Sequence, residues 1–314
     1  MERQILNPAT EGEWLELRKL DVTSTMSAAL FDLSPYLTRF ELYHAKRDGL
    51  ELPFNENERM AQGSRLQDYA ADEIARKHGW TVWRADEYIR IPQLRMGSSF
   101  DYRVLCPKRG PGILEIKGVD HFRHKELWVE EQAPEHIEIQ LQQQLEVRED
   151  YEWGMIAGFT SIYDWHEYER PRDREFGAAI VKKVREFWTD VDAGRAPDPD
   201  FSRDDAVIKA LHKGGDILDR TEDLDFNALL ARHHRLQAEK KQAEDDFKAT
   251  QAELIHRLGN HSEAFGRDFK IKVLMVKDSP GTLVEESMVG TYLGARKGYP
   301  RCTVSDLHKK RGEA

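Results

Sequence analysis

The stretch MGSSFDYRVLCPKRGPGILEIKGVD, residues 96–120, decides the fold because it places charged side chains inside short apolar segments. Residues two apart on a strand share a face, so Glu115 and Lys117 point the same way while Ile116 points into the opposite layer. An unpaired charge in a core costs several kcal/mol, so another group must compensate these two. Asp101, in the adjoining predicted strand, can supply a second carboxylate beside Glu115.

This arrangement of charges predicts a metal site. Two carboxylates and a backbone carbonyl suit a hard cation such as Mg²⁺, which keeps several waters. Such an ion lowers the pKa of a coordinated water and neutralises charge on a phosphate, while a nearby lysine can orient or deprotonate the water. The pattern therefore indicates phosphodiester hydrolysis. The alternative is an ion pair on an edge strand, because this spacing also recurs by chance.

Composition limits the class of protein. The chain has 314 residues and a formal charge of −10, so contact with nucleic acid must come from a local patch or through bound cations. No apolar run reaches the roughly 18 to 20 residues that span a bilayer, and the first residues lack the features of a secretory signal, so we expect a soluble intracellular protein with no membrane partner. Cys106 and Cys302 lack a Cys-x-x-Cys partner, which predicts reduced thiols rather than a disulfide, zinc or iron–sulfur site.

The order of predicted elements indicates a mixed α/β core over about residues 10–195. Helical patterns run to about residue 79, and a helix is expected within 133–150, followed by one or two strands. Three strands are predicted between the helical regions, in residues 80–92, 94–106 and 112–118.

The remainder of the chain has a different pattern. An amphipathic helix ends at Gly194 and a Pro/Asp-rich linker follows, so we predict one domain over residues 1–195 and an extension over 196–314. Within the extension, apolar or small residues near 3.5 spacing predict one long helix over 226–260 that packs on a neighbour or partner. A hairpin from residue 268 and a basic tail complete the expectation.

Four sequence blocks resemble a known family. Ser98-Ser99-Phe100-Asp101, thirteen residues, then Glu115-Ile116-Lys117 resembles the PD-(D/E)XK nuclease signature. Residues 12–195 resemble the λ-exonuclease-like, or YqaJ-type, branch of viral recombination nucleases, through EWLELRKLDVTSTMSAAL (13–30), RMAQGSRLQDYAADEIA (59–75) and EIQLQQQLEVREDYEWGMIAGF (138–159). The resemblance implies a restriction-endonuclease-like core, a mixed sheet flanked by helices, with a C-terminal helical and hairpin extension.

The resemblance also implies roles for individual residues at the centre of the site. Asp101 and Glu115 would bind metal, with the backbone carbonyl of Ile116 as a further ligand. Lys117 would handle the attacking water, and Gln140 would position the lysine or the scissile phosphate. The implied cofactor is Mg²⁺, with Mn²⁺ as a substitute.

Other implied roles lie around this centre. Arg18 would hold a DNA phosphate such as the 5′-terminal one, helped by the hydroxyl of Thr25, because a guanidinium binds phosphate oxygens bidentately. The family usually carries a glutamate beside the metals where this chain has Gln67, and an amide would hold a second cation less well. Asp68 is one residue along the helix and points about 100° away. Residues 142–144, all glutamine, are expected on the helix surface.

The main hypothesis is that the protein is an enzyme. It would be a Mg²⁺-dependent exonuclease that degrades one strand of linear duplex DNA, 5′ to 3′, and leaves single strands for an annealing protein. No Walker A sequence occurs, so the chain should not hydrolyse ATP. The resemblance implies a homo-oligomer, a ring-shaped trimer, encoded by a phage or prophage and working in the cytoplasm of a bacterial host. The alternatives are a DNA-end-binding or assembly protein weakened through Gln67, and an endonuclease on the same fold.

Overall fold

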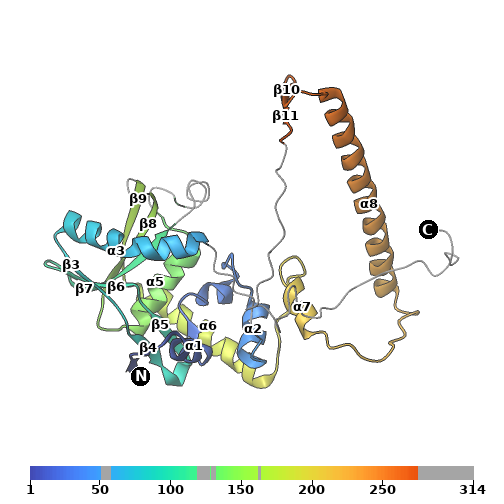
Figure 1. Cartoon of the computed structure of the whole chain (residues 1–314). Coiled ribbons are helices and arrows are strands. Elements are labelled where there is room, and N and C mark those ends of the chain that lie inside the picture. Colours follow the sequence, from blue (N-terminus) through green and yellow to red (C-terminus); the bar gives the residue numbers. More distant parts are fainter. Residues whose placement is uncertain (51–57, 119–127, 129–131, 162–163, 275–314) are drawn as a thin grey trace, which may run out of the picture. The chain divides into compact units, whose positions relative to one another are not determined.

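The computed structural model describes residues 1–50, 58–118, 128, 132–161 and 164–274 (Figure 1). The chain forms two compact units, Met1–Ile208 and Lys209–Ala314. The mixed α/β class predicted from the sequence is confirmed in the first unit, which contains two sheets and the helices that flank them.

A five-stranded sheet forms the centre of the first unit. Its strands run in the order β3-β6-β7-β8-β9, and β7 and β8 are parallel while the other neighbours are antiparallel. Parallel neighbours need a crossover connection, and here the crossover contains helix α5. The bounds are β3 Thr81–Arg84, β6 Tyr102–Cys106, β7 Gly110–Gly118, α5 Glu135–Val147, β8 Trp153–Ser161 and β9 Asp164–Pro171.

Helices cover both faces of this sheet. Helix α3, Glu58–His78, packs Ala70, Ala71 and Ile74 on one face, where they meet Leu114 and Ile116 of β7. On the other face, Ile113 of β7 packs with α5 and with α6, Arg174–Ala193. Alternate residues of β7 therefore enter different layers, as the period of a strand requires.

A second, four-stranded sheet has the order β1-β4-β5-β2, with β2 and β5 parallel. Short helices accompany it at the N-terminal end of the chain. The bounds are β1 Gln4–Leu6, α1 Glu11–Lys19, β2 Val22–Thr23, η1 Ser27–Phe31, α2 Arg39–Arg47, β4 Tyr88–Ile91, η2 Pro92–Leu94 and β5 Met96–Ser99.

The prediction of three strands between residues 80 and 118 was wrong, because there are five. The first two predicted strands each divide: β3 and β6 join the five-stranded sheet, whereas β4 and β5 pair with each other in the four-stranded sheet. The chain leaves one sheet after Arg84 and returns to it after Asp101. Asp101 thus lies at the point where β5 of one sheet passes into β6 of the other.

The predicted linker after Gly194 packs on the first unit. Asp204 is fully buried and accepts hydrogen bonds from the Thr38 hydroxyl (2.6 Å) and the Asp200 N–H (2.7 Å). Helix α7, Asp205–Leu211, begins directly after it. The division of the chain into domains 1–195 and 196–314 stays a prediction.

The described part of the second unit consists of one long helix and a small hairpin. Helix α8, Leu224–Leu258, agrees with the helix predicted over 226–260. Strands β10, Glu263–Phe265, and β11, Lys270–Lys272, pair antiparallel. The hairpin was expected to begin at residue 268, but the described hairpin begins at Glu263. The predicted basic tail lies outside the described residues. No described helix is both long enough and apolar enough to span a membrane.

Candidate active site

The carboxylate of Glu115 lies at the centre of the candidate site, on the face of β7 that meets α5. Its side chain is buried, with 1% exposed. Gln140 Nε2 donates to Glu115 Oε1 at 2.5 Å, and Gln144 Nε2 donates to Oε2 at 2.7 Å. These two glutamines are one turn apart on α5, so one helix face holds both oxygens of a carboxylate presented by the sheet.

Lys117 shares this face of β7 and forms an ion pair with Glu115 Oε1. Burial alone would lower the pKa of Lys117, but the nearby carboxylates of Glu115 and Asp101 outweigh burial and raise it. The lysine is therefore a cation in this arrangement and compensates part of the negative charge. The expectation that Glu115 and Lys117 share a face while Ile116 enters the opposite core is confirmed.

Asp101 approaches Glu115 from the junction of β5 and β6. Its Oδ2 accepts a hydrogen bond from the Ile116 N–H at 2.9 Å, which fixes the carboxylate beside β7. Burial, followed by the charge of Glu115, raises the pKa of Asp101 to about 7. Two carboxylates this close in a buried place repel each other, and a divalent cation is one way to remove that cost.

Gln67 on α3 reaches the same strand from the opposite layer. Its Nε2 donates to the Ile116 carbonyl at 3.1 Å, so the amide lies beside the backbone group predicted to bind metal. Asp68 is directed elsewhere: it accepts a hydrogen bond from the Tyr102 hydroxyl and lies 3.6 Å from Arg84 Nη1. Among the described residues no group of three His, Cys, Asp or Glu side chains is placed to hold a metal.

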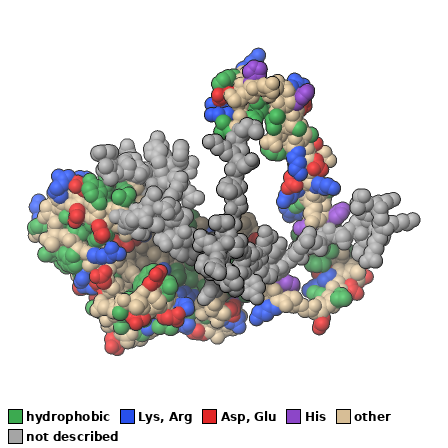
Figure 2. All heavy atoms as spheres, viewed as in Figure 1, with side chains coloured by type: hydrophobic (Ala, Val, Ile, Leu, Met, Phe, Trp, Pro, Cys, Tyr) green, Lys and Arg blue, Asp and Glu red, His purple; other side chains and the backbone are tan. Residues whose placement is uncertain are grey.

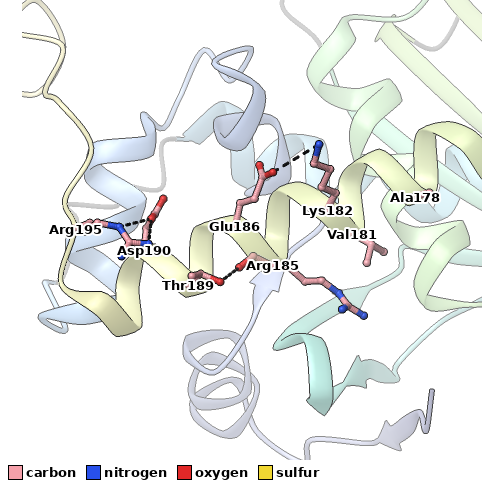
Figure 3. Close-up of a pocket in the computed structure, with 8 residues that line it drawn as sticks. All are labelled: Ala178, Val181, Lys182, Arg185, Glu186, Thr189, Asp190 and Arg195. Carbon is pink, nitrogen blue, oxygen red and sulfur yellow. Dashed lines mark hydrogen bonds and ion pairs between the residues drawn. The ribbon is translucent and has the colours of Figure 1, made fainter.

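A small pocket opens beside these groups. It has a volume of about 220 Å³, and its lining includes Asp101, Gln67, Trp14 and Ser99. A larger hollow of about 560 Å³ lies along α6, but none of its lining residues is a predicted site residue (Figure 3). Four of its charged groups form two ion pairs, Arg195 with Asp190 at 2.7 Å and Lys182 with Glu186 at 3.8 Å. We therefore assign the chemistry to the smaller pocket.

A basic cluster adjoins this pocket through Trp14. The Trp14 Nε1–H donates to Ser99 Oγ at 2.7 Å, and the Arg18 guanidinium carbon lies 4.4 Å from the centroid of the Trp14 ring. Arg18 Nη2 donates to Thr25 Oγ1 at 3.1 Å, so the structure brings together the two residues predicted to hold a phosphate. Lys46 Nζ donates to the Arg18 carbonyl at 2.6 Å.

No described carboxylate lies within ion-pair distance of Arg18 or Lys46. Among the described residues, both positive charges are therefore unpaired. Burial lowers the pKa of Arg18. Burial, followed by the charge of Arg18, lowers the pKa of Lys46 to about 8. Two partly desolvated cations side by side form a place where an anion is stabilised.

Comparison with known proteins finds a family model that matches part of the chain. The YqaJ-like viral recombinase domain matches residues 13–152. The matched range contains every residue of the candidate site, from Trp14 to Gln144. This part of the chain is therefore similar to the family that the four sequence blocks resemble. The mixed sheet flanked by helices agrees with the PD-(D/E)XK core expected from the sequence.

Solved structures similar to the chain include exonucleases. The alkaline exonuclease LHK-Exo from Laribacter hongkongensis in complex with dAMP is 21% identical, with a TM-score of 0.49, and the match covers 59% of this chain and 94% of that one. A second structure of the same exonuclease is 20% identical, with a TM-score of 0.48 and the same coverage. A phage-related exonuclease from Haemophilus somnus 129PT is 14% identical over 60% of this chain and 91% of its own, with a TM-score of 0.39. No curated protein matches the chain.

Two residues of the candidate site were missed by sequence reasoning. Gln144 was expected on the helix surface together with Gln142 and Gln143, but all three are buried. The expectation was wrong because both faces of α5 are enclosed, and a polar residue on an enclosed helix needs partners that its sequence does not reveal. Lys46 was missed because it reaches Arg18 from a separate helix, and no spacing in the sequence connects the two.

Proposed function

We propose that the protein is a Mg²⁺-dependent exonuclease that removes nucleotides from one strand of linear duplex DNA, in the 5′ to 3′ direction. One observation carries the proposal: the pocket beside Asp101 is also lined by Trp14 and Ser99, and Trp14 stacks on the Arg18 of the basic cluster. A phosphate held by the cluster and a phosphodiester at the carboxylates would therefore belong to the same end of one strand.

The residues at the pocket fit a hard cation. The carboxylates of Asp101 and Glu115 and the carbonyl of Ile116 are oxygen donors of the kind that Mg²⁺ and Mn²⁺ prefer. Burial, followed by the charge of Glu115, raises the pKa of Asp101, and a bound cation would offset both effects. We assign these three groups as ligands. When bound, Mg²⁺ would supply charge neutralisation at the phosphate and a more acidic water.

The remaining residues hold the Glu115 carboxylate in place and donate hydrogen bonds to the reacting groups. Lys117 stays charged beside Glu115 and can donate to a phosphate oxygen or to the attacking water. Gln140 and Gln144 keep the Glu115 carboxylate in one orientation, since each oxygen accepts from one amide. Such fixed orientation matters because a misplacement of about 1 Å can cost roughly 100-fold in rate.

The basic cluster would recognise a terminal phosphate. Arg18 is held by stacking on Trp14 and by its hydrogen bond to Thr25, so its guanidinium is already ordered before an anion arrives. Lys46 adds a second charge from α2. A 5′-phosphate would pair with both cations, whereas a 5′-hydroxyl end would leave them unpaired.

A second candidate function rests on Gln67. Because its amide donates to the Ile116 carbonyl, the position faces the proposed metal ligands with no negative charge. A second cation would be held less well, and a protein that binds DNA ends without cutting them would have this property. An endonuclease on the same core is the third reading, since the fold does not determine the substrate.

The test compares purified full-length protein on linear duplex, nicked circular and covalently closed circular DNA, with Mg²⁺, with Mn²⁺ and with EDTA. We expect cleavage of linear duplex that requires the metal, with 5′-phosphorylated ends degraded faster than 5′-hydroxyl ends. Cutting of closed circles would favour the endonuclease. Tight binding of ends with no cleavage at any metal concentration would favour the binding protein.

The proposed setting follows from the family. A recombinase nuclease that exposes single strands suits an annealing protein as its partner, in the cytoplasm of a bacterial host that carries the phage or prophage. Continuous degradation without ATP would be helped by a ring-shaped homotrimer that encloses the DNA.

A further inference from the structure

Helix α8 of the second unit presents apolar side chains to solvent along its length. In the described residues only Leu258, at its C-terminal end, is buried, whereas Phe247 is 69% exposed and Leu229 is 59% exposed. Figure 2 shows apolar side chains at the surface of this helix among charged ones. A 35-residue helix with such a surface draws most of its stability from packing against another element.

The apolar residues form one seam. Phe226, Leu229, Leu236, Phe247 and Leu254 recur at spacings of three, seven and eleven, which all fall on the core positions of one heptad repeat, the pattern of a two-helix coiled coil. The same seam contains polar residues at its heptad positions 233, 240, 250 and 257. Polar residues inside a seam lower stability but select register and orientation.

Charge alternates along this unit in four blocks. Residues 219–225 carry four acidic and one basic side chain, residues 232–241 four basic and one acidic, residues 244–253 four acidic and one basic, and residues 257–272 four basic and two acidic. Reversing this order gives the opposite sign at every block. A second copy laid antiparallel places the basic block 232–241 opposite the acidic block 244–253, whereas a parallel copy places each block opposite itself.

We propose that α8 pairs antiparallel with the α8 of a second copy of this chain. The register that places Leu229 opposite Leu254 and Leu236 opposite Phe247 also places His233 opposite Thr250 and Lys240 opposite Ala243. No two like charges meet in the seam. In a parallel pair Lys240 would face Lys240.

This register also fills a pocket at the end of the helix. An apolar pocket of about 350 Å³ lies between the last turns of α8 and the β10–β11 hairpin, and its lining includes Leu254, Leu258 and Phe269. The residue opposite position 257 is Phe226 of the second copy, an aromatic side chain that the pocket accommodates. The acidic residues 222–225 of that copy then adjoin the basic hairpin.

The pairing is tested on the full-length protein by light scattering after size exclusion. The double variant Leu236→Glu/Phe247→Glu places charges in the seam, and Ala238→Glu/Ala252→Glu places the same two charges on the opposite face of the helix. Pairing joins copies two at a time, so it would join two of the proposed trimers into an assembly of six chains. We expect the seam variant to have half that mass and the control to keep it, with equal helix content by circular dichroism. Unchanged mass in the seam variant overturns the proposal and leaves this face to another partner.

Orientation is tested by disulfide trapping between single-cysteine variants. Leu236→Cys and Phe247→Cys, each with Cys106→Ala and Cys302→Ser, are mixed in equal amounts and oxidised, and the linked peptides are identified by mass spectrometry. An antiparallel pair gives the 236–247 link between two chains in large excess over either self-link. A dominant 236–236 link means a parallel pair and overturns the proposed orientation, and the absence of any link through these positions overturns the pairing.

Discussion

Replacing Gln144 by Leu should slow DNA cleavage without unfolding the protein. The amide of Gln144 donates to Glu115 Oε2 at 2.7 Å and to the Ser99 carbonyl at 3.2 Å, while Leu fills a similar volume and donates nothing. A hydrogen bond to a charged group contributes about 1.5–3 kcal/mol. If that contribution is needed to hold Glu115 in the transition state, kcat falls by about 10-fold to 150-fold.

The matched control is Gln142→Leu on the same helix. Gln142 is also buried, but its amide bonds with the Pro171 carbonyl (3.0 Å) and the Asp173 N–H (2.9 Å), away from the carboxylates. Both variants should lose comparable stability in thermal unfolding, and only Gln144→Leu should lose kcat in a saturating assay on linear duplex. Equal kcat losses in the two variants, or an unchanged kcat in Gln144→Leu, would refute the assignment of Gln144 to Glu115.

Three further predictions concern the other groups of the site. Glu115→Gln and Asp101→Asn should each abolish cleavage yet keep DNA binding in a gel-shift assay, because a neutral amide replaces a metal ligand and removes repulsion against phosphate; normal Mg²⁺-dependent hydrolysis by either variant contradicts the ligand assignment. Lys46 is protonated below its pKa of about 8 and neutral above it, so the advantage of 5′-phosphorylated over 5′-hydroxyl ends in kcat/KM should be full below pH 8 and decline above it. Lys46→Met should lose this pH dependence. It should also lose about tenfold or more of the advantage, because a charge-assisted hydrogen bond contributes about 1.5–3 kcal/mol. A pH profile like that of the wild type argues against contact between Lys46 and the phosphate. Gln67→Glu should lower the Mg²⁺ concentration for half-maximal cleavage, since a carboxylate binds the ion better than an amide, and superimposable titrations of the two proteins would show that position 67 does not act on the metal.

The centre of the site could be predicted from the sequence because it depends on local geometry. The period of a strand puts Glu115 and Lys117 on one face, and the resemblance to YqaJ nucleases selects Gln140 and Arg18. Arg18 bonds to Thr25, the partner named for it, whereas Gln140 bonds to Glu115 and not to the lysine, one of the two groups that it was expected to position. The catalytic roles of these residues remain proposals, and the Glu115→Gln variant above tests the first of them.

Features that depend on tertiary pairing were not predictable. Each of the two predicted strands breaks, after Arg84 and at Asp101, because its two halves join different sheets. The alternation of apolar residues is the same on both sides of each break, so the sequence does not show where the break lies. Gln144 and Gln142 are indistinguishable by polarity, although only one of them reaches the carboxylate. Lys46 ends up beside Arg18 only because α2 packs near α1, which no local pattern shows.

The position of Asp101 between two sheets bears on the length of the product. The five-stranded sheet carries Glu115 and Lys117, while Ser99, beside Trp14 and Arg18, closes the last strand of the four-stranded sheet. The span between the proposed terminal-phosphate cluster and the carboxylates therefore depends on the two residues that join β5 to β6, and on Gln144, whose amide bonds to both the Ser99 carbonyl and Glu115. A span of one nucleotide releases mononucleotides, and each residue added to that junction would move the cut further from the strand end and release longer fragments.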